Sequence, residues 1–295
     1  MRTQRIRFIA AVMVATALPS ASAARALNSP SAPAADATGR DFNAQNFAAD
    51  SFRVDNIWLP LIPGRQYVME GQANRGAGLL PHQVIFTVTD LTKVINGVRS
   101  LVIWDRDIGQ GGVLQEAELA FNAQDKVGNV WNMAEYPEEY DAGKFVGAPS
   151  TWIAGLAGAN AGVAMRAWPR VGTSSWIQGF IPAIGFEDQA MVAKQHQRTC
   201  VPIVCFGNVL VVDETNLLSP TDGHQLKYHA PMVGIVRIAP GVGRTGQEIL
   251  DLVKVRYLGP KEMATARQEA LKLESRAYQV SAVYRQTPPM GRIGQ

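Results

Sequence analysis

The chain has 295 residues, of which 47% are hydrophobic and 18% are charged. This composition excludes an intrinsically disordered chain, which would carry more charge and fewer apolar residues. A chain of this length buries roughly three-quarters of its unfolded surface, so it needs neither a metal nor a disulfide merely to fold. We therefore expect one β-rich domain over residues 51–288.

The first 23 residues have the layout of a secretory signal peptide. Arg2, Arg5 and Arg7 precede an apolar run over 8–18, and small residues follow up to Ala23. The apolar run is too short to cross a bilayer core of roughly 30 Å as a helix. The sequence therefore predicts a signal peptide over 1–23 and export to the periplasm or the extracellular space.

Signal removal changes the charge balance. The full chain has 28 basic and 25 acidic residues, and loss of three arginines leaves equal numbers of each. A neutral chain has no basic field to hold phosphates, so nucleic acid is not an expected partner. No second long apolar segment follows, so the mature chain is not expected to span a membrane. Residues 24–50 are rich in Ala, Ser, Pro and Asn, which predicts a flexible leader.

From residue 51 the pattern is one of strands and turns. Residues 84–89 alternate as in a strand, Asn96-Gly97 is a strong hairpin signal, and 101–104 can form the return strand. Hairpin signals between successive strands favour an antiparallel sheet. The expected fold is mainly β: a twisted antiparallel sheet curled into a half-barrel or small sandwich. Further strands are expected at 114–121, 130–136, 174–180, 208–212, 225–229, 233–238 and 249–257.

A long helix is expected at the end of the chain, over residues 260–284. Pro260 suits its first turn, and Pro288-Pro289 would stop any continuation. An apolar stripe recurs at intervals of three and four residues, which predicts a helix that covers one face of the sheet or forms a dimer seam. The stripe consists of Met263, Ala266, Ala270, Leu273, Ala277, Val280 and Tyr284.

A calcium site is one hypothesis for the acidic segment around residue 107. Asp105, Asp107 and Glu116 occupy positions 1, 3 and 12 of a calcium-loop count. Gly109 and Gln110 depart from the usual residues at positions 5 and 6, and a solvated hairpin tip would explain the same acids. No other cofactor is expected.

An enzyme is the alternative function. Paired carboxylates can serve as the acid and base of a glycosidase, and tryptophans can stack on sugar rings. The same acids would be solvated turn residues in a protein without catalysis. A carbohydrate-active or metal-assisted hydrolase requires Glu116, Asp125 and Glu135 to meet in one cleft. The other acids nearby are Glu118, Glu138, Glu139 and Asp141.

Cys200 and Cys205 are the two cysteines of the chain. In an oxidising compartment an even pair suggests a disulfide, and two buried thiols are the alternative. A continuous strand would hold the two Cα atoms roughly 17 Å apart, beyond bridging distance. A disulfide therefore requires residues 201–204 to turn back.

Two segments resemble patterns of uncharacterised exported bacterial β-rich proteins. The first is Ala123-Gln124-Asp125-Lys126-Val127-Gly128-Asn129-Val130-Trp131, followed by Glu135 and Glu139-Tyr140. The second is Tyr228-His229-Ala230-Pro231-Met232-Val233-Gly234-Ile235-Val236, in which Met232 stands where glycine is usual. The second segment is also loosely similar to half-barrel proteins of the bacterial envelope. The resemblance implies export and a β-rich fold, and it implies no catalytic residue.

The function expected first is that of a non-catalytic binding protein. A curled sheet lined with tryptophan and methionine would leave a concave site for an apolar or amphipathic ligand, or for an envelope partner. Trp104, Trp131, Met133 and Glu135 are the expected ligand-binding residues, because period-two alternation places the last three on one face. A dry core with Glu135 at its solvent end is the alternative.

Overall fold

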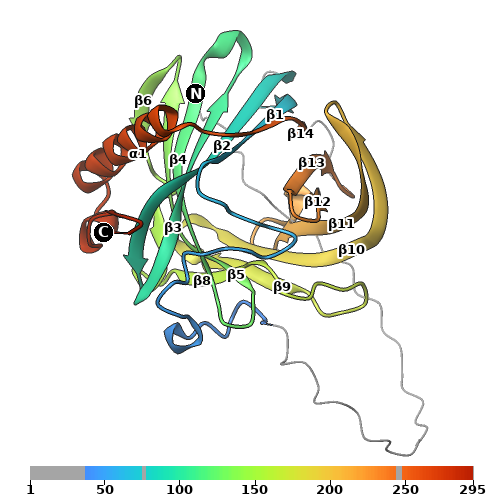
Figure 1. The fold of residues 1–295 in the computed structure, drawn as a ribbon, viewed down its shortest axis with the longest axis horizontal. Coiled ribbons are helices and arrows are strands. Elements are labelled where there is room, and N and C mark those ends of the chain that lie inside the picture. Colours follow the sequence, from blue (N-terminus) through green and yellow to red (C-terminus); the bar gives the residue numbers. More distant parts are fainter. Residues whose placement is uncertain (1–36, 75–77, 244–247, 295) are drawn as a thin grey trace, which may run out of the picture.

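The computed structural model describes residues 37–74, 78–243 and 248–294. Within these ranges, twelve antiparallel strands follow one another around a single sheet (Figure 1). Their bounds are β1 Arg65–Asn74, β2 Leu79–Ile95, β3 Val98–Ile108, β4 Leu114–Gln124, β5 Val130–Asp141, β8 Asn160–Met165, β9 Trp176–Ile181, β10 Phe186–Val201, β11 Val204–Asn216, β12 Gln225–Ala230, β13 Gly234–Pro240 and β14 Ile249–Tyr257.

Short elements lie beside this ring. β6 (Lys144–Gly147) and β7 (Trp152–Ile153) pair with β5, and β15 (Gly291–Arg292) pairs with β2. The single-turn 3-10 helices of the described residues are η1 Ala44–Asn46, η2 Gln110–Gly112, η3 Pro182–Ile184, η4 Pro220–Asp222 and η5 Tyr284–Gln286.

The sheet closes into a barrel because β1 pairs with strands on both of its sides. Tyr67 of β1 lies opposite Phe86 of β2 and opposite Val255 of β14. The predicted antiparallel sheet is confirmed, and the prediction of a half-barrel or sandwich is corrected to a closed barrel. The closing contact joins strands roughly 180 residues apart, which no local sequence pattern reports. The Asn96-Gly97 turn is confirmed, with φ of 47° and 79°.

Residues 37–64 pack on the barrel before its first strand begins. The backbone N–H of Ile177 donates to the carbonyl of Thr38, and the Phe42 and Phe47 rings meet Trp131 at 5.7 and 6.0 Å between centroids. The leader expected over 24–50 is thus packed against the domain from Ala37 onward. The predicted signal peptide, 1–23, and residues 24–36 lie outside the described residues.

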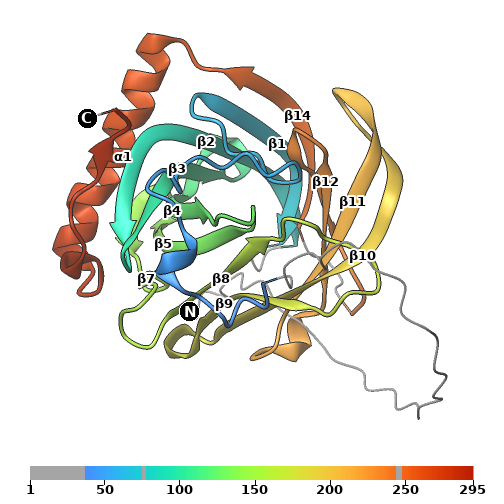
Figure 2. The ribbon, with the colours of Figure 1, turned by 60° about the horizontal axis from the view of Figure 1, so that its bottom comes forward.

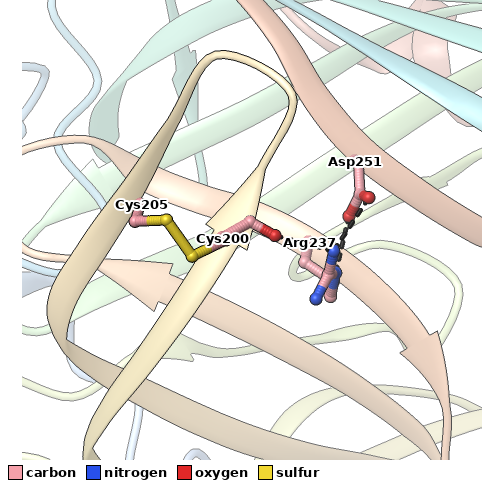
Figure 3. Close-up of a disulfide and its surroundings, with 4 residues drawn as sticks. All are labelled: Cys200, Cys205, Arg237 and Asp251. Carbon is pink, nitrogen blue, oxygen red and sulfur yellow. Dashed lines mark hydrogen bonds and ion pairs between the residues drawn. A yellow bond between two sulfur atoms is a disulfide. The ribbon is translucent and has the colours of Figure 1, made fainter.

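β10 and β11 form a long hairpin that ends at the disulfide (Figure 3). Cys200 and Cys205 are bonded and face each other across the hairpin, with Val201 paired to Val204, so Pro202-Ile203 is the turn that the disulfide prediction required. Arg237 of β13 donates to the carbonyl of Cys200 at 3.0 Å and forms an ion pair with Asp251 at 2.6 Å. The tip is therefore fastened to two other strands.

The helix α1 (Pro260–Val280) packs on the outside of the barrel against β2 and β4, as expected (Figure 2). It ends four residues earlier than predicted. Tyr284, the last residue of the predicted stripe, belongs to η5 and is buried there. No helix of the described residues is both long and apolar enough to cross a membrane.

Ion pairs fasten α1 to the barrel. Lys93 binds Glu274 at 2.7 Å, and the side chains of both residues are almost fully buried. Arg276 reaches Glu138, and Arg267 reaches Asp90, each at 2.6 Å. The apolar stripe of α1 thus carries a buried acid, Glu274, that the sequence pattern did not single out.

Candidate functional site

A cavity of about 310 Å³ lies inside the barrel. The segment ahead of β1 crosses one opening of the barrel in Figure 2, and its residues 59–61 form part of the cavity wall. The apolar residues of the wall are Leu59, Pro60, Leu61, Tyr67, Met69, Val84, Phe86, Ala120, Ala164, Val233, Ile235, Ile238 and Leu250.

The rest of the wall is rich in carboxyl groups. Strand alternation sends every second side chain inward, and adjacent strands place these acids opposite one another. Asp105 of β3 is paired with Glu118 of β4, and Asp107 with Glu116. Seven acids of the described part of the chain line the cavity: Asp105, Asp107, Glu116, Glu118, Glu135, Glu214 and Glu248.

Burial raises the pKa of three of these acids, Asp105, Glu118 and Glu135, and neighbouring negative charge adds to the effect for the first two. Burial, followed by the neighbouring charge of Asp107, raises the pKa of Asp105 to about 7. Burial and the charges of Glu135 and Glu116 raise the pKa of Glu118 well above its usual value. Burial also raises the pKa of Glu135, against the opposing effect of the indole N–H that Trp152 donates at 2.9 Å.

Among the described residues, two basic side chains also line the cavity. Lys227 forms an ion pair with Glu214 at 2.6 Å; burial acts to lower the pKa of Lys227, but Glu214 outweighs it and the net shift is upward. His229 is 3% exposed, and burial lowers its pKa to about 4, so its ring is neutral near pH 7.

The neutral His229 ring has a defined hydrogen-bonding role. Its Nδ1 lies 3.0 Å from the carbonyl oxygen of Trp58, an acceptor, so Nδ1 carries the proton. Its buried Nε2 has no hydrogen-bond partner among the described residues. This nitrogen is therefore an acceptor on an inward-facing side chain of the cavity wall.

The structure places only one of the four expected ligand-binding residues in the cavity wall. Glu135 lines the cavity, whereas Trp104, Trp131 and Met133 are absent from its wall. The reason lies in the pairing of β4 with β5, where Phe121 is opposite Ala134 and Asn122 is opposite Asn132. Met133 is the extra residue of a β-bulge, so the period-two face expected across it is broken.

Both tryptophans are packed elsewhere. Trp104 lies next in sequence to the inward-facing Asp105, so it faces outward, and the guanidinium of Arg106 lies 4.2 Å from its ring. Trp131 is 2% exposed, contacts the rings of residues 42 and 47, and donates its indole N–H to Asp125 at 2.9 Å.

The acids of the hydrolase hypothesis are also divided. Glu116 and Glu135 share the cavity, but Asp125 lies in the turn between β4 and β5, where it accepts from the backbone N–H groups of residues 127–129. Glu138 is buried beneath α1 and accepts from Tyr136 and Arg276.

The calcium hypothesis names three residues that all line the cavity, Asp105, Asp107 and Glu116. Within the described residues, no group of three or more His, Cys, Asp or Glu side chains has the arrangement of a metal site. Asp107 instead lies 3.6 Å from Nε2 of His82, which approaches Glu248 at 3.1 Å. Sequence reasoning missed the contributions of Glu214, Lys227 and His229, because only barrel closure brings β11 and β12 opposite β4.

A pH-dependent stability difference follows for Glu118→Gln. The raised pKa of Glu118 means that the folded state holds its proton where the unfolded state has lost it, so this group destabilises the fold as pH rises above about 4.3. At pH 8 we expect the variant to be more stable than wild type by about 1 kcal/mol or more, or roughly 2–4 °C in melting temperature.

The stability difference should disappear at pH 4, where both states are protonated. Thermal melts of both proteins across pH 4–8 measure it. Equal melting temperatures at pH 8 would contradict the burial of an acid inside the barrel.

Comparisons with known proteins provide no family. No family model matches the sequence, and no curated protein matches it. Two solved structures are similar at 11% identity, each covering 68% of this chain and 99% of their own. They are a "putative lipoprotein" from Parabacteroides distasonis ATCC 8503, with a TM-score of 0.34, and a "putative exported protein with YmcC-like fold" from Bacteroides fragilis NCTC 9343, with a TM-score of 0.37. One of these proteins is named as a lipoprotein and the other as an exported protein. TM-scores this low support no argument about function.

Proposed function

We propose that this chain is an exported binding protein that holds one small amphipathic ligand inside its barrel. The observation that carries the proposal is that the wall of the 310 Å³ cavity is partly apolar and partly acidic. Tyr67, Met69 and Phe86 offer an apolar surface, and the acids of β3 and β4 offer a polar one. A small-molecule site typically combines an apolar enclosure with a few polar groups that orient the ligand.

The position of the cavity supports binding of a small molecule rather than of a folded partner. The side chains that would contact the ligand point into the barrel, and the segment 59–61 adds to the wall. The signal-peptide pattern of residues 1–23 supports the exported location.

Hydrolysis is the second candidate, favoured by one observation. Asp105, with a pKa raised to about 7, shares the cavity with other carboxyl groups, and a general acid needs such a raised pKa. Against hydrolysis, Asp125 of the expected acid cluster lies outside the cavity and accepts hydrogen bonds from backbone N–H groups of its own turn. Calcium binding by Asp105, Asp107 and Glu116 remains a proposal attached to this second candidate.

Native mass spectrometry of protein purified from its own host tests the binding function. We expect a bound species of small mass on the wild-type protein. Ala120→Phe fills the cavity, because Ala120 is part of its wall, and should abolish the bound species. Ala282→Phe adds the same side chain at an exposed position and should retain it.

A wild-type protein that carries no ligand, and that binds none of the amphiphiles named below, would refute the proposed function. Turnover of a glycoside that is lost in Asp105→Asn would instead favour the hydrolase.

A further inference from the structure

We infer that the ligand carries a primary ammonium group, which lies among the carboxyl groups of the wall, and an alkyl or aryl tail, which lies on the apolar residues. This inference rests on the proposed function. The cluster of acids does not carry this inference alone. The second observation is the buried Nε2 of His229, which lies in the same wall and has no partner among the described residues.

The polar wall presents mainly acceptors to a ligand. The side-chain amide groups already donate within the wall: Asn122 to the side-chain oxygen of Asn132, and Asn132 to the carbonyl of Gln178. Gln178 in turn donates to Glu214 at 2.9 Å. Nε2 of the neutral His229 is an acceptor with no partner among the described residues, and an ionised carboxyl group can only accept, so the complementary head group is a hydrogen-bond donor.

Charge selects among donors. Seven carboxyl groups line the cavity, and Lys227 is paired with one of them, Glu214. The pairing of Asp105 with Glu118 and of Asp107 with Glu116 across β3 and β4 concentrates carboxyl groups in one part of the wall. An ammonium group would gain charge-assisted hydrogen bonds with these carboxylates, whereas a hydroxyl would gain weaker, uncharged ones and a carboxylate would be repelled.

The geometry of the head group is restricted as well. An ammonium has three N–H donors, which can serve Nε2 of His229 and carboxylates on neighbouring strands. A trimethylammonium group has the same charge and no donor. A second ammonium at the far end of the tail would be placed against Met69, Phe86 and Leu250 and would lose its hydration there.

Isothermal titration of the full mature chain at pH 8 tests the inference with C8 probes. Octylamine is compared with octanol, octanoate, octyltrimethylammonium and 1,8-diaminooctane. We expect octylamine to bind at least tenfold more tightly than each of the others. Comparison with octyltrimethylammonium shows whether the positive charge suffices or N–H donors are needed. Comparison with 1,8-diaminooctane shows whether the site prefers an amine with an apolar tail to a polyamine.

Variants locate the head group. Glu118→Gln should weaken octylamine binding about tenfold and leave octanol binding unchanged. Glu269→Gln removes a partly exposed carboxylate of α1 that pairs with Lys272 and is not part of the cavity wall, and this variant should bind every probe as the wild type does. Melting temperatures of both variants show that they are folded.

The outcomes distinguish this inference from the proposed function. Octanol or octanoate binding as tightly as octylamine would overturn the ammonium inference and leave the binding function intact. Failure of all five probes at millimolar concentration, with no species on the native protein, would overturn both. Binding of Ca²⁺ alone, lost in Glu116→Gln and not displaced by octylamine, would also overturn the inference.

Discussion

Lys93→Ala is expected to lower the free energy of unfolding by about 3–5 kcal/mol. Lys93 is 1% exposed, and its ammonium contacts Glu274 at 2.7 Å, the Tyr278 hydroxyl at 3.0 Å and the carbonyl of Pro288 at 2.6 Å. Its removal leaves the carboxylate of Glu274 buried without its cation. Equilibrium denaturation in urea measures the loss.

Two further variants test the reason for that loss. Lys272→Ala breaks an exposed pair with Glu269 on the same helix, and it should cost at most about 1 kcal/mol. Lys93→Met combined with Glu274→Met removes both buried charges and should recover most of the stability. A loss below about 1 kcal/mol for Lys93→Ala would mean that the buried pair of Lys93 and Glu274 adds little to the attachment of α1.

Trp131→Ala should destabilise the fold by a similar amount, about 3–5 kcal/mol. The indole fills a site between the barrel and residues 42 and 47, and its N–H is bound to Asp125. Truncation leaves a void and removes one of the two hydrogen bonds that Oδ2 of Asp125 accepts; the other, from the side-chain amide of Asn129 at 2.8 Å, remains. Because Trp131 lies outside the cavity wall, ligand retention by the folded fraction should be unchanged.

Trp168→Ala is the matched control, since Trp168 is 59% exposed and should be replaceable within about 0.5 kcal/mol. Denaturant melts and native mass spectra of both variants give the two readouts. A small loss of stability with complete loss of the bound ligand in Trp131→Ala would instead place this indole at the ligand.

Local patterns predicted the elements that depend on neighbouring residues. The Asn96-Gly97 turn, the helix after Pro260 and the turn between the cysteines each follow from a few adjacent side chains. β10 was not predicted, because its second half extends into the long hairpin and alternates mainly polar residues such as Lys194 and Arg198 without an apolar face. Its existence depends on pairing with β11.

The candidate site was predicted only in part, for a related reason. Asp105, Asp107, Glu116 and Glu135 were recognised by residue type, and all four line the cavity. Their convergence with His229 requires barrel closure, which depends on distant pairings. The bulge at Met133 is a single-residue irregularity, and one such residue moves a whole face of a strand.

The pairing of β1 with β14 also governs when the cavity first exists. Roughly 180 residues separate the partners, so at 5–20 residues per second β1 waits on the order of 10–40 s for its second neighbour to be synthesised. Until then the nascent chain offers an unfinished sheet with β1 as an open edge. In the exported chain that we propose, this open sheet could still thread through a translocation channel. The long-range closure would then follow on the far side, where the cysteines would meet an oxidant.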